Sequence, residues 1–346
     1  MNNKVSIIVL NWNRWKDTVE CLESLYLTSY YDYTIIVVDN GSEDGSIVKI
    51  REFCSNKLDS LKYPGKNPVK IFEYEKRESE TANKLQKDFY ELPSTEKLIL
   101  IKNDQNYGFA EGNNIGIRFA LNKLNTDYIL LLNNDTVTDK CFLDELVKVA
   151  EKDQKIGFIG PKVYNYEYEG KKNIISFAGG LLNMYNGASI HIGDGEIDCG
   201  QYEKIREVDF VEGSCILIKK EVLEKIGLLD PKYHAYWEDN DLCSRGAAAN
   251  YKSFVNPKSK IWHKVSVSST NEVKTYYLTR NRLWFMKKYS NLLQYTIFIL
   301  YFFIFKFWIY LIISWKNKSI QMFLKGIIDG LVRYEKSNPD IIVKIK

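Results

Sequence analysis

The stretch Val-Ser-Ile-Ile-Val-Leu-Asn-Trp-Asn, residues 5–13, leads from a run of apolar side chains into two asparagines, Asn11 and Asn13. A short run rich in valine and isoleucine is typical of a strand that is buried on both faces of a sheet. Residues 33–38 form a second such run, which ends in the turn Asp39-Asn40-Gly41-Ser42. Apolar residues at helical spacing lie between the two runs, at Trp15, Val19, Leu22 and Tyr26. The sequence therefore predicts a strand, a helix and a second strand.

The same alternation continues through the first half of the chain. Residues 98–101, 128–132 and 156–159 are further apolar runs of strand length. Helical faces are predicted at Ile117, Leu121 and Leu124, and at Phe142, Leu143, Leu146, Val147 and Ala150. Such alternation predicts an α/β fold with a doubly wound, Rossmann-like, mainly parallel sheet and helices on both faces. Ligands of these sheets bind beyond the carboxyl ends of the strands.

Two regions depart from this alternation. Residues 54–97 are polar and mixed in charge, and they contain one good strand candidate, 69–74. We interpret them as an insertion on the surface, whose role the sequence leaves open. Residues 162–206 are irregular and rich in glycine and asparagine, which predicts loops and hairpins, and regularity resumes at residues 208–218.

Composition excludes several classes of protein. The 346 residues carry a formal net charge of +4, with the charges interspersed rather than gathered into the basic stripe of a nucleic-acid-binding protein. The six cysteines lie far apart without a CxxC pair, so we expect reduced thiols in a cytoplasmic protein. Residues 1–10 lead directly into a strand-like run, and no secretory signal peptide is expected.

The C-terminal quarter differs in kind. Residues 295–314 are almost all apolar or aromatic, with Lys306 as the one charge, and their length is close to the ~20 residues that cross a bilayer. Lysines flank both ends, at Lys287, Lys288, Lys316, Lys318 and Lys325. We predict association with a membrane surface. A spanning helix, a helix lying in the interface, a buried helix of a soluble domain and an oligomer contact are all left open.

Asp39 is the first candidate site residue, because it follows the second predicted strand directly. A carboxylate there can accept a hydrogen bond from a nucleobase N–H or a ribose hydroxyl. Asn11 and Asn13 follow the first strand and are expected at the same edge of the sheet. The alternative is that Asp39-Asn40-Gly41-Ser42 is only a tight turn, since these residue types favour turns.

The triplet Asn133-Asn134-Asp135 is the second candidate, and it follows the strand predicted at 128–132. Hard cations such as Mg²⁺ take oxygen ligands and often bind through one or two carboxylates together with substrate phosphates. A carboxylate here is therefore suited to hold a divalent ion against a diphosphate. The alternative is a strand-to-helix turn in which Thr138 or Asp139 caps the next helix.

The third candidate is the acidic run Glu238-Asp239-Asn240-Asp241, which precedes a segment predicted to be helical. We select Asp239 as a general base, on the expectation that a helix N-terminus keeps its carboxylate ionised. Asp241 is predicted to be structural and to hold either Arg245 at i+4 or the local backbone. Helix capping without any catalytic role is the alternative for these acids.

Five ordered blocks, at residues 5–13, 37–42, 106–114, 131–135 and 227–245, together resemble the family 2 glycosyltransferases. The last block contains Gly227-Leu228-Leu229-Asp230-Pro231 and Tyr236-Trp237-Glu238-Asp239-Asn240-Asp241-Leu242. The Asn-Asn-Asp triplet is similar to that of the rhamnosyltransferase-like subgroup. With Asn in its first position, Asp135 must supply more of the metal coordination than in a two-carboxylate site.

The resemblance implies a GT-A fold, a nucleoside-diphosphate-sugar donor, Mg²⁺ or Mn²⁺, and inversion at the anomeric carbon. It also implies that Asp39 binds the base, Asp135 the metal and diphosphate, and that Asp239 deprotonates the acceptor. His263 stands where related enzymes place a second metal or phosphate ligand. The nucleotide-sugar site is expected to comprise Asn11, Asn13, Asp39, Asn106, Gly108, Asn113, Asn133, Asn134 and Gly213.

On this resemblance, residues 1–265 are expected to form the GT-A domain, and residues 266–346 a C-terminal helical region. The expected acceptor is a glycan or a lipid-linked molecule of cell-surface polysaccharide synthesis. The expected location is the cytoplasmic face of the membrane, and self-association is left open. A non-catalytic, membrane-associated carbohydrate-binding or scaffold protein on the same fold is the alternative.

Overall fold

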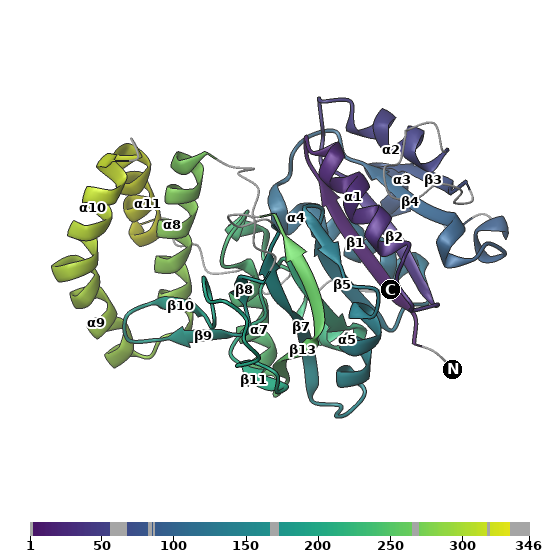
Figure 1. Ribbon diagram of the computed structural model, residues 1–346. Coiled ribbons are helices and arrows are strands. Elements are labelled where there is room, and N and C mark those ends of the chain that lie inside the picture. The colour runs from purple at the N-terminus through teal and green to yellow at the C-terminus, as the bar shows by residue number, and fades with distance from the viewer. Residues whose placement is uncertain are drawn as a thin grey trace.

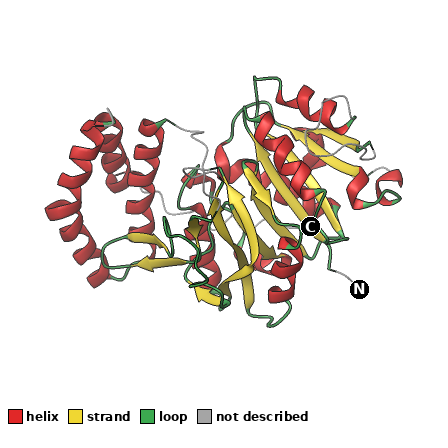
Figure 2. Cartoon of the chain, viewed as in Figure 1, coloured by secondary structure: helices red, strands yellow, loops and turns green. Residues whose placement is uncertain are grey.

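The computed structural model describes residues 3–55, 68–81, 85, 87–166, 173–264, 270–316 and 319–332. Within these residues, eleven strands form a central sheet with helices on both of its faces, and a separate layer of helices lies at one end of the molecule (Figure 1). The predicted α/β class is confirmed. Figure 2 shows the same division, with strands concentrated in one part and the C-terminal helices in the other.

One half of the sheet is parallel. Its strands, in spatial order, are β3 (Lys70–Glu75), β4 (Lys97–Lys102), β2 (Tyr33–Asp39), β1 (Val5–Asn11) and β5 (Tyr128–Asn133). The apolar side chains of the inner strands are buried because helices cover both faces. The register places Asn11 opposite Asp39, and Leu10 opposite Asn133. The predicted site residues therefore emerge from one edge of the sheet, at the carboxyl ends of its strands.

The other half of the sheet is mixed. It continues from β5 through β12 (Cys215–Lys219), β7 (Ile156–Asn165), β13 (Lys252–His263) and β11 (Arg206–Val208). Two short strands join its margin: β6 (Thr136–Thr138) pairs with β13, and β8 (Ile175–Phe177) pairs with β7. A separate hairpin is formed by β9 (Gly180–Asn183) and β10 (Ala188–His191).

The helices that follow these strands hold the loops at the carboxyl edge. They are α1 (Trp15–Leu25), α2 (Ser46–Cys54), α3 (Lys76–Thr81), α4 (Gly108–Lys123), α5 (Phe142–Ala150), α6 (Lys220–Ile226) and α7 (Glu238–Ala248). Helix α4 lies close on the sheet. A side chain at Gly112 would meet Leu10, and one at Gly116 would meet Ile8, so glycine permits this approach. Short 3₁₀ turns occur at Lys87–Tyr90, Ser94–Glu96 and Pro231–Tyr233.

The C-terminal layer consists of α8 (Asn271–Tyr289), α9 (Leu292–Tyr301), a π-helical turn (Phe302–Lys306), α10 (Phe307–Lys316) and α11 (Ile320–Val332). Its buried apolar residues form a core separate from that of the sheet. Tyr233 and Trp237, which belong to the loop before α7, are part of this second core. The layer is thus packed against the segment that leads into the acidic run.

The structure corrects several expectations. Residues 54–97 are not only a surface insertion, because β3 is an edge strand of the main sheet, paired with β4. Residues 56–67, 82–84 and 86 of this stretch lie outside the described residues, as do 167–172 of the irregular stretch, 265–269, 317–318 and 333–346. The irregular stretch predicted from residue 162 begins later, since β7 continues to Asn165. The regular segment 208–218 is divided between β11 and β12.

All six cysteines are free thiols in the structure. Four are buried in the core, namely Cys21, Cys54, Cys215 and Cys243, and two are exposed, Cys141 and Cys199.

Candidate active site

Asp39 is fully buried at the end of β2. Its Oδ1 accepts a hydrogen bond from Asn11 Nδ2 at 2.6 Å, and its Oδ2 accepts one from the backbone N–H of Ser42 at 3.0 Å. Asn11 Oδ1 in turn accepts from Thr18 Oγ1 at 2.7 Å and from Asn134 Nδ2 at 3.3 Å. Asp39 therefore closes the predicted turn and also anchors a polar network that joins the ends of β1 and β2 to the residue after β5.

Asn13 and Asn106 hold the loops on either side of this network. Asn13 adopts a left-handed backbone conformation, with φ of 53°, and its Oδ1 accepts from the N–H of Glu43 at 2.7 Å. Asn106 Oδ1 accepts from the N–H of Gly108 at 2.8 Å and from Asn40 Nδ2 at 2.9 Å. Both asparagines thus stabilise loops at the carboxyl edge of the sheet.

Gly108 is required by its surroundings. It has a φ of +81°, and a Cβ there would lie 2.3 Å from Nδ1 of His234. Asn113, one turn further along α4, is buried and donates to the carbonyl of Phe109 at 2.9 Å. The block at residues 106–114 thereby packs directly on the loop that precedes α7.

The structure brings Asp135 and His263 together. His263 ends β13, which pairs with β6 so that His263 is opposite Thr136, and its Nε2 lies 3.1 Å from Asp135 Oδ1. Glu212 is a third member, with Oε1 3.7 Å from Nδ1 of His263. Burial alone would lower the pKa of His263, but the hydrogen bond and charge of Asp135, with the charge of Glu212, raise it above its usual value.

The helix-capping alternative for the triplet is wrong. Strand β6 follows Asp135, and α5 begins only at Phe142 after Cys141, which makes no side-chain cap. The hydroxyl of Thr138 instead contacts Ser24, and Asp139 accepts from the N–H of Cys141. Asp135 is therefore held by a tight strand-to-strand connection.

Asp135 and His263 are placed to supply some, but not all, of the ligands of a divalent ion. Among the described residues, no group of three or more histidine, cysteine, aspartate or glutamate side chains is arranged to hold a metal by itself. Two ligands adjacent on an octahedral ion with bonds of about 2.1 Å are about 3 Å apart, which matches the 3.1 Å between Asp135 Oδ1 and His263 Nε2. His263 Nδ1 and Glu212 Oε2 are buried and lack hydrogen-bond partners within the described part of the chain. The pair is suited to supply two ligands, with substrate phosphates supplying others.

Asp239 lies in the first turn of α7 and faces the loop before β12. Its Oδ2 accepts from the N–H of Gly213 at 2.9 Å, and its Oδ1 accepts from the N–H of Asn240 at 2.7 Å. The expectation that this environment favours ionisation is wrong in direction. Burial raises the pKa of Asp239 above its usual value, despite these backbone hydrogen bonds. Burial and the charge of Asp239 also raise the pKa of the neighbouring Glu238.

Gly213 contributes a backbone hydrogen bond, and the absence of a side chain at this position is not required by its neighbours. A Cβ at this position would lie 3.6 Å from Asp239 Oδ2, which is ordinary van der Waals contact. Nothing in the described protein thus forces glycine here, and its N–H is the group that fixes Asp239.

Asp241 has the structural role that the sequence predicts. Its carboxylate accepts from Arg245 Nε at 2.9 Å, from Lys288 Nζ at 2.6 Å and from the Tyr289 hydroxyl at 2.8 Å. The last two residues lie on α8. The carboxylate therefore ties the start of α7 to the C-terminal layer.

Sequence reasoning missed the unusual backbone before α7. His234, Tyr236 and Trp237 all have positive φ values, of 63°, 67° and 74°. The side chain of Asn281 on α8 donates to the carbonyls of residues 233, 235 and 236. Arg280, also on α8, is buried and donates to the carbonyls of residues 232 and 233.

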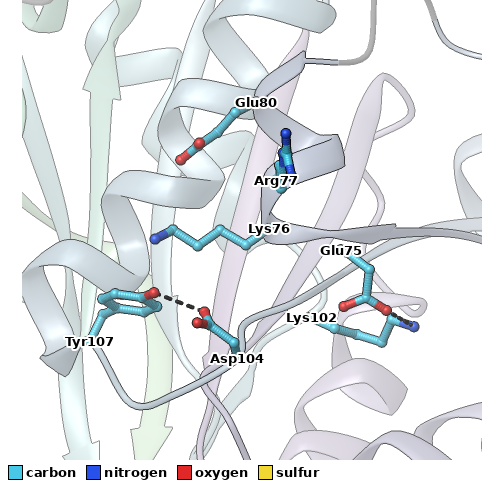
Figure 3. Close-up of a pocket in the computed structure, with 7 residues that line it drawn as sticks. All are labelled: Glu75, Lys76, Arg77, Glu80, Lys102, Asp104 and Tyr107. Carbon is cyan, nitrogen blue, oxygen red and sulfur yellow. Dashed lines mark hydrogen bonds and ion pairs between the residues drawn. The ribbon is translucent and has the colours of Figure 1, made fainter.

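A polar pocket adjoins the carboxyl ends of β3 and β4 (Figure 3). It has a volume of about 340 Å³ and is lined by Glu75, Lys76, Arg77, Glu80, Lys102, Asp104 and Tyr107. Lys102 pairs in register with Asp39 and forms an ion pair with Glu75 at 2.6 Å. The Tyr107 hydroxyl donates to Asp104 at 2.8 Å. The described part of the insertion thus contributes one wall of a pocket beside the predicted nucleotide edge.

Three comparisons relate the chain to known proteins. The family model of glycosyl transferase family 2 matches residues 6–227. The chain is 25% identical over 250 residues to the low-salt glycan biosynthesis hexosyltransferase Agl10 of Haloferax volcanii, a match that covers 72% of this chain and 64% of that protein. It is 26% identical over 179 residues to the O-antigen biosynthesis protein RfbC of Myxococcus xanthus, covering 50% and 13%. The chain thus spans less than two thirds of either relative.

The fold resembles that of the mannosyltransferase PcManGT from Pyrobaculum calidifontis, whose structure was solved in complex with GDP-Man and Mn²⁺. The TM-score is 0.54 at 11% sequence identity, covering 97% of this chain and 89% of that one. This likeness confirms the expected GT-A fold. With the family model matching most of the sheet-containing part, the chain belongs to glycosyl transferase family 2.

Proposed function

We propose that the protein transfers a sugar from a nucleoside-diphosphate sugar to a hydroxyl group of a glycan or lipid-linked acceptor. The observation that carries this proposal is a continuous set of contacts joining the three acidic sites. Asn11 links Asp39 to Asn134, and the N–H of Asn133 donates to the carbonyl of Ser214 at 2.9 Å. Gly213, adjacent to Ser214, holds Asp239. Donor, diphosphate and acceptor groups would then meet along one sheet edge.

We assign the donor to the first two sites. Each oxygen of Asp39 accepts one hydrogen bond in the described structure, and a carboxylate oxygen can accept two. Because Asp39 is buried, a nucleoside N–H or hydroxyl would reach it when the loops around it shift. Asp135 and His263 would hold Mg²⁺ or Mn²⁺, which would neutralise charge on the departing diphosphate. The Mn²⁺ in the complex of the mannosyltransferase with similar fold supports this assignment.

Asp239 would act as the general base. Its carboxylate accepts the proton of the acceptor hydroxyl while that oxygen attacks the anomeric carbon. The bond from this carbon to the diphosphate oxygen breaks on the opposite side, and a single displacement of this kind inverts the configuration. Burial raises the pKa of Asp239, which makes the ionised carboxylate a stronger proton acceptor than an exposed one.

We base the proposed sugar and cellular setting on the resemblance. The Asn-Asn-Asp triplet supports rhamnose among the possible sugars. The names of the curated relatives, which concern glycan and O-antigen biosynthesis, support a cell-surface glycan acceptor and a cytoplasmic location. We assign catalysis to residues 1–265, with residues 266–346 as an appended helical region.

The test is Asp239→Asn, assayed with a panel of nucleotide sugars in the presence and absence of Mg²⁺ or Mn²⁺. We expect sugar transfer to be lost while calorimetric binding of the nucleoside diphosphate is retained. Asp194→Asn, at an exposed aspartate, is the matched control and should behave as the unmodified protein. An equal loss of nucleotide binding in Asp239→Asn would instead place Asp239 in the donor site. Nucleotide binding without transfer of any sugar by the unmodified protein would favour a non-catalytic binding protein.

A further inference from the structure

The segment Leu292–Lys316, made up of α9, the π-helical turn and α10, has two unlike sides. By length and composition it is the one helical segment in the described part of the chain that could cross a membrane. Its inner side packs on the rest of the layer, where Phe298, Phe302 and Ser314 are buried. Its outer side exposes large apolar residues: Leu293, Ile297, Leu300, Ile304, Trp308, Ile312 and Trp315. The alternative of a wholly buried helix is therefore wrong.

The exposed residues form one continuous stripe. They recur every three or four positions, which is the spacing of one helix face. Over 25 residues the stripe is about 37 Å long. Figure 1 shows α9 and α10 at the end of the molecule farthest from the central sheet. A soluble monomer rarely leaves a patch of this size in water, so the stripe calls for a partner.

The charges around the stripe identify that partner as an anionic one. Between residues 273 and 332 the sequence has nine basic residues and a single acidic residue, Asp329. Asp329 is buried and accepts from the Tyr276 hydroxyl, so it offers little negative charge to the surface. Exposed lysines stand at both ends of the stripe, at Lys287 and Lys316. Apolar side chains with flanking cations and tryptophans are typical of a helix at an anionic lipid surface.

The packing of the layer decides between spanning and lying flat. The inner side of α10 is joined to α8 by a hydrogen bond of 2.6 Å from Arg282 Nη1 to the Tyr310 hydroxyl. Helix α8 carries several charges and is itself bonded to the loop before α7. If the segment crossed a bilayer, these charges and that loop would be drawn into hydrocarbon, which is strongly unfavourable.

We propose that the outer face of α9 and α10 lies in the plane of an anionic membrane surface, with its apolar stripe inserted and its lysines on the lipid headgroups. The docking does not depend on the proposed catalytic activity. A structural link to the site exists all the same. The turn of the β9–β10 hairpin packs on α9, where a side chain at Gly187 would meet Phe298, and Ser189 on β10 contacts Asn240 beside Asp239. A membrane-bound acceptor would thus be delivered close to the assigned base.

The first experiment measures binding of the full-length protein to sealed phosphatidylcholine vesicles with and without phosphatidylglycerol. The variant is Ile304→Glu with Trp308→Glu, two residues that are 55% and 58% exposed and whose replacement leaves the inner side intact. Tyr31→Glu, at an 81% exposed residue, is the control. We expect binding to phosphatidylglycerol vesicles, weakened about tenfold or more without the anionic lipid or in the double variant, and unchanged in the control.

The second experiment fixes the topology. Lys287→Cys and Lys316→Cys are made separately in a Cys141→Ser, Cys199→Ser background, which removes the two exposed thiols. A membrane-impermeant maleimide added outside the vesicles should label both positions to the same extent. Labelling of only one end would overturn the in-plane proposal in favour of a spanning helix. A dimer in solution that fails to bind vesicles, and that the double variant converts to a monomer, would overturn it in favour of a second copy. Vesicle binding and thiol labelling are both measured without sugar transfer. A failure of the proposed catalytic function would therefore not affect either result.

Discussion

At the scale of single residues, Asn281 connects the C-terminal layer to the assigned catalytic segment. It is fully buried, and its Nδ2 lies 2.9, 2.8 and 2.7 Å from the carbonyl oxygens of Tyr233, Ala235 and Tyr236. Non-glycine residues with positive φ persist where the surroundings hold them. Asn281 thus positions the backbone that leads into Asp239, although it lies outside the five sequence blocks that resemble the family.

We expect Asn281→Leu to lower kcat by about tenfold or more, because a small displacement of Asp239 weakens proton transfer. KM for the donor should change little. The loss of donors to buried carbonyls should also cost about 1–3 kcal/mol of stability. Steady-state kinetics and thermal unfolding of the variant are compared with those of Asn271→Leu, at an exposed position on the same helix. Reduced stability with unchanged kcat would show that Asn281 has no positioning role.

Individual site residues were predictable where the determining contact is local in sequence. Asp241 and Arg245 are one helical turn apart, and their ion pair follows from that spacing. Glu212 carries no local signal, since it lies in the loop before β12 whereas His263 ends β13, about fifty residues later in the chain. The shifted pKa of Asp239 was mispredicted for a similar reason. The helix terminus is visible in the sequence, whereas the burial that outweighs it arises from tertiary packing.

At the scale of elements, β7 shows why its length was underestimated. The strand contains Lys162, a fully buried cation that breaks the apolar run. Its Nζ lies 2.9 Å from Asp198 Oδ2 and 2.5 Å from Glu203 Oε1, and Tyr164 donates to the same Asp198 oxygen at 2.5 Å. A charge can enter a sheet when partners satisfy it. These partners come from a loop some forty residues later, so the sequence of the strand does not reveal them.

This cluster should make stability depend on acid pH. The hydrogen bonds from Tyr164 and Lys162 outweigh burial and lower the pKa of Asp198 to about 2. Because the folded-state pKa lies below the unfolded one, the stabilisation is present above about pH 4 and is lost as the pH falls towards 2. We expect Asp198→Asn to lower Tm at pH 7 and the difference from the unmodified protein to shrink at pH 2 to 3. Thermal unfolding across this range tests it, and a difference that stays constant with pH would contradict it.

Four strands of the parallel half were predictable to within about one residue at each end, because strands buried on both faces appear as continuous apolar runs. β1, β2, β4 and β5 all have this character. The three-residue strands β6, β8 and β11 were not predicted. Their pairing depends on the neighbouring strand rather than on any pattern that three residues can carry.

At the scale of the whole molecule, the two hydrophobic cores are not independent. Tyr233 and Trp237 are covalently part of the sheet-containing region but are buried in the core of the C-terminal layer. Lys288 and Tyr289 of that layer bind Asp241 at the start of α7. Removing the layer would expose apolar side chains and leave a buried carboxylate with fewer partners.

Deletion of residues 266–346 should therefore destabilise the remaining protein. We expect aggregation on expression, or a Tm at least about 5 °C below that of the full chain, since the lost burial of several large side chains costs more than about 3 kcal/mol. Differential scanning calorimetry with size-exclusion chromatography makes the measurement. A truncated protein that is monomeric with unchanged Tm would establish residues 1–265 as a domain that folds alone.

The burial of Tyr233 and Trp237 in the core of the C-terminal layer also limits how segments of this chain can be exchanged with those of its relatives. In a chimaera joined near residue 265, Tyr233 and Trp237 would pack against helices from another protein, whose side chains do not match them. Exchange of the C-terminal helices would have to carry residues 231–237 along as one cassette. The proposed membrane-binding face and the backbone that leads into Asp239 would then be exchanged together rather than as two separable modules.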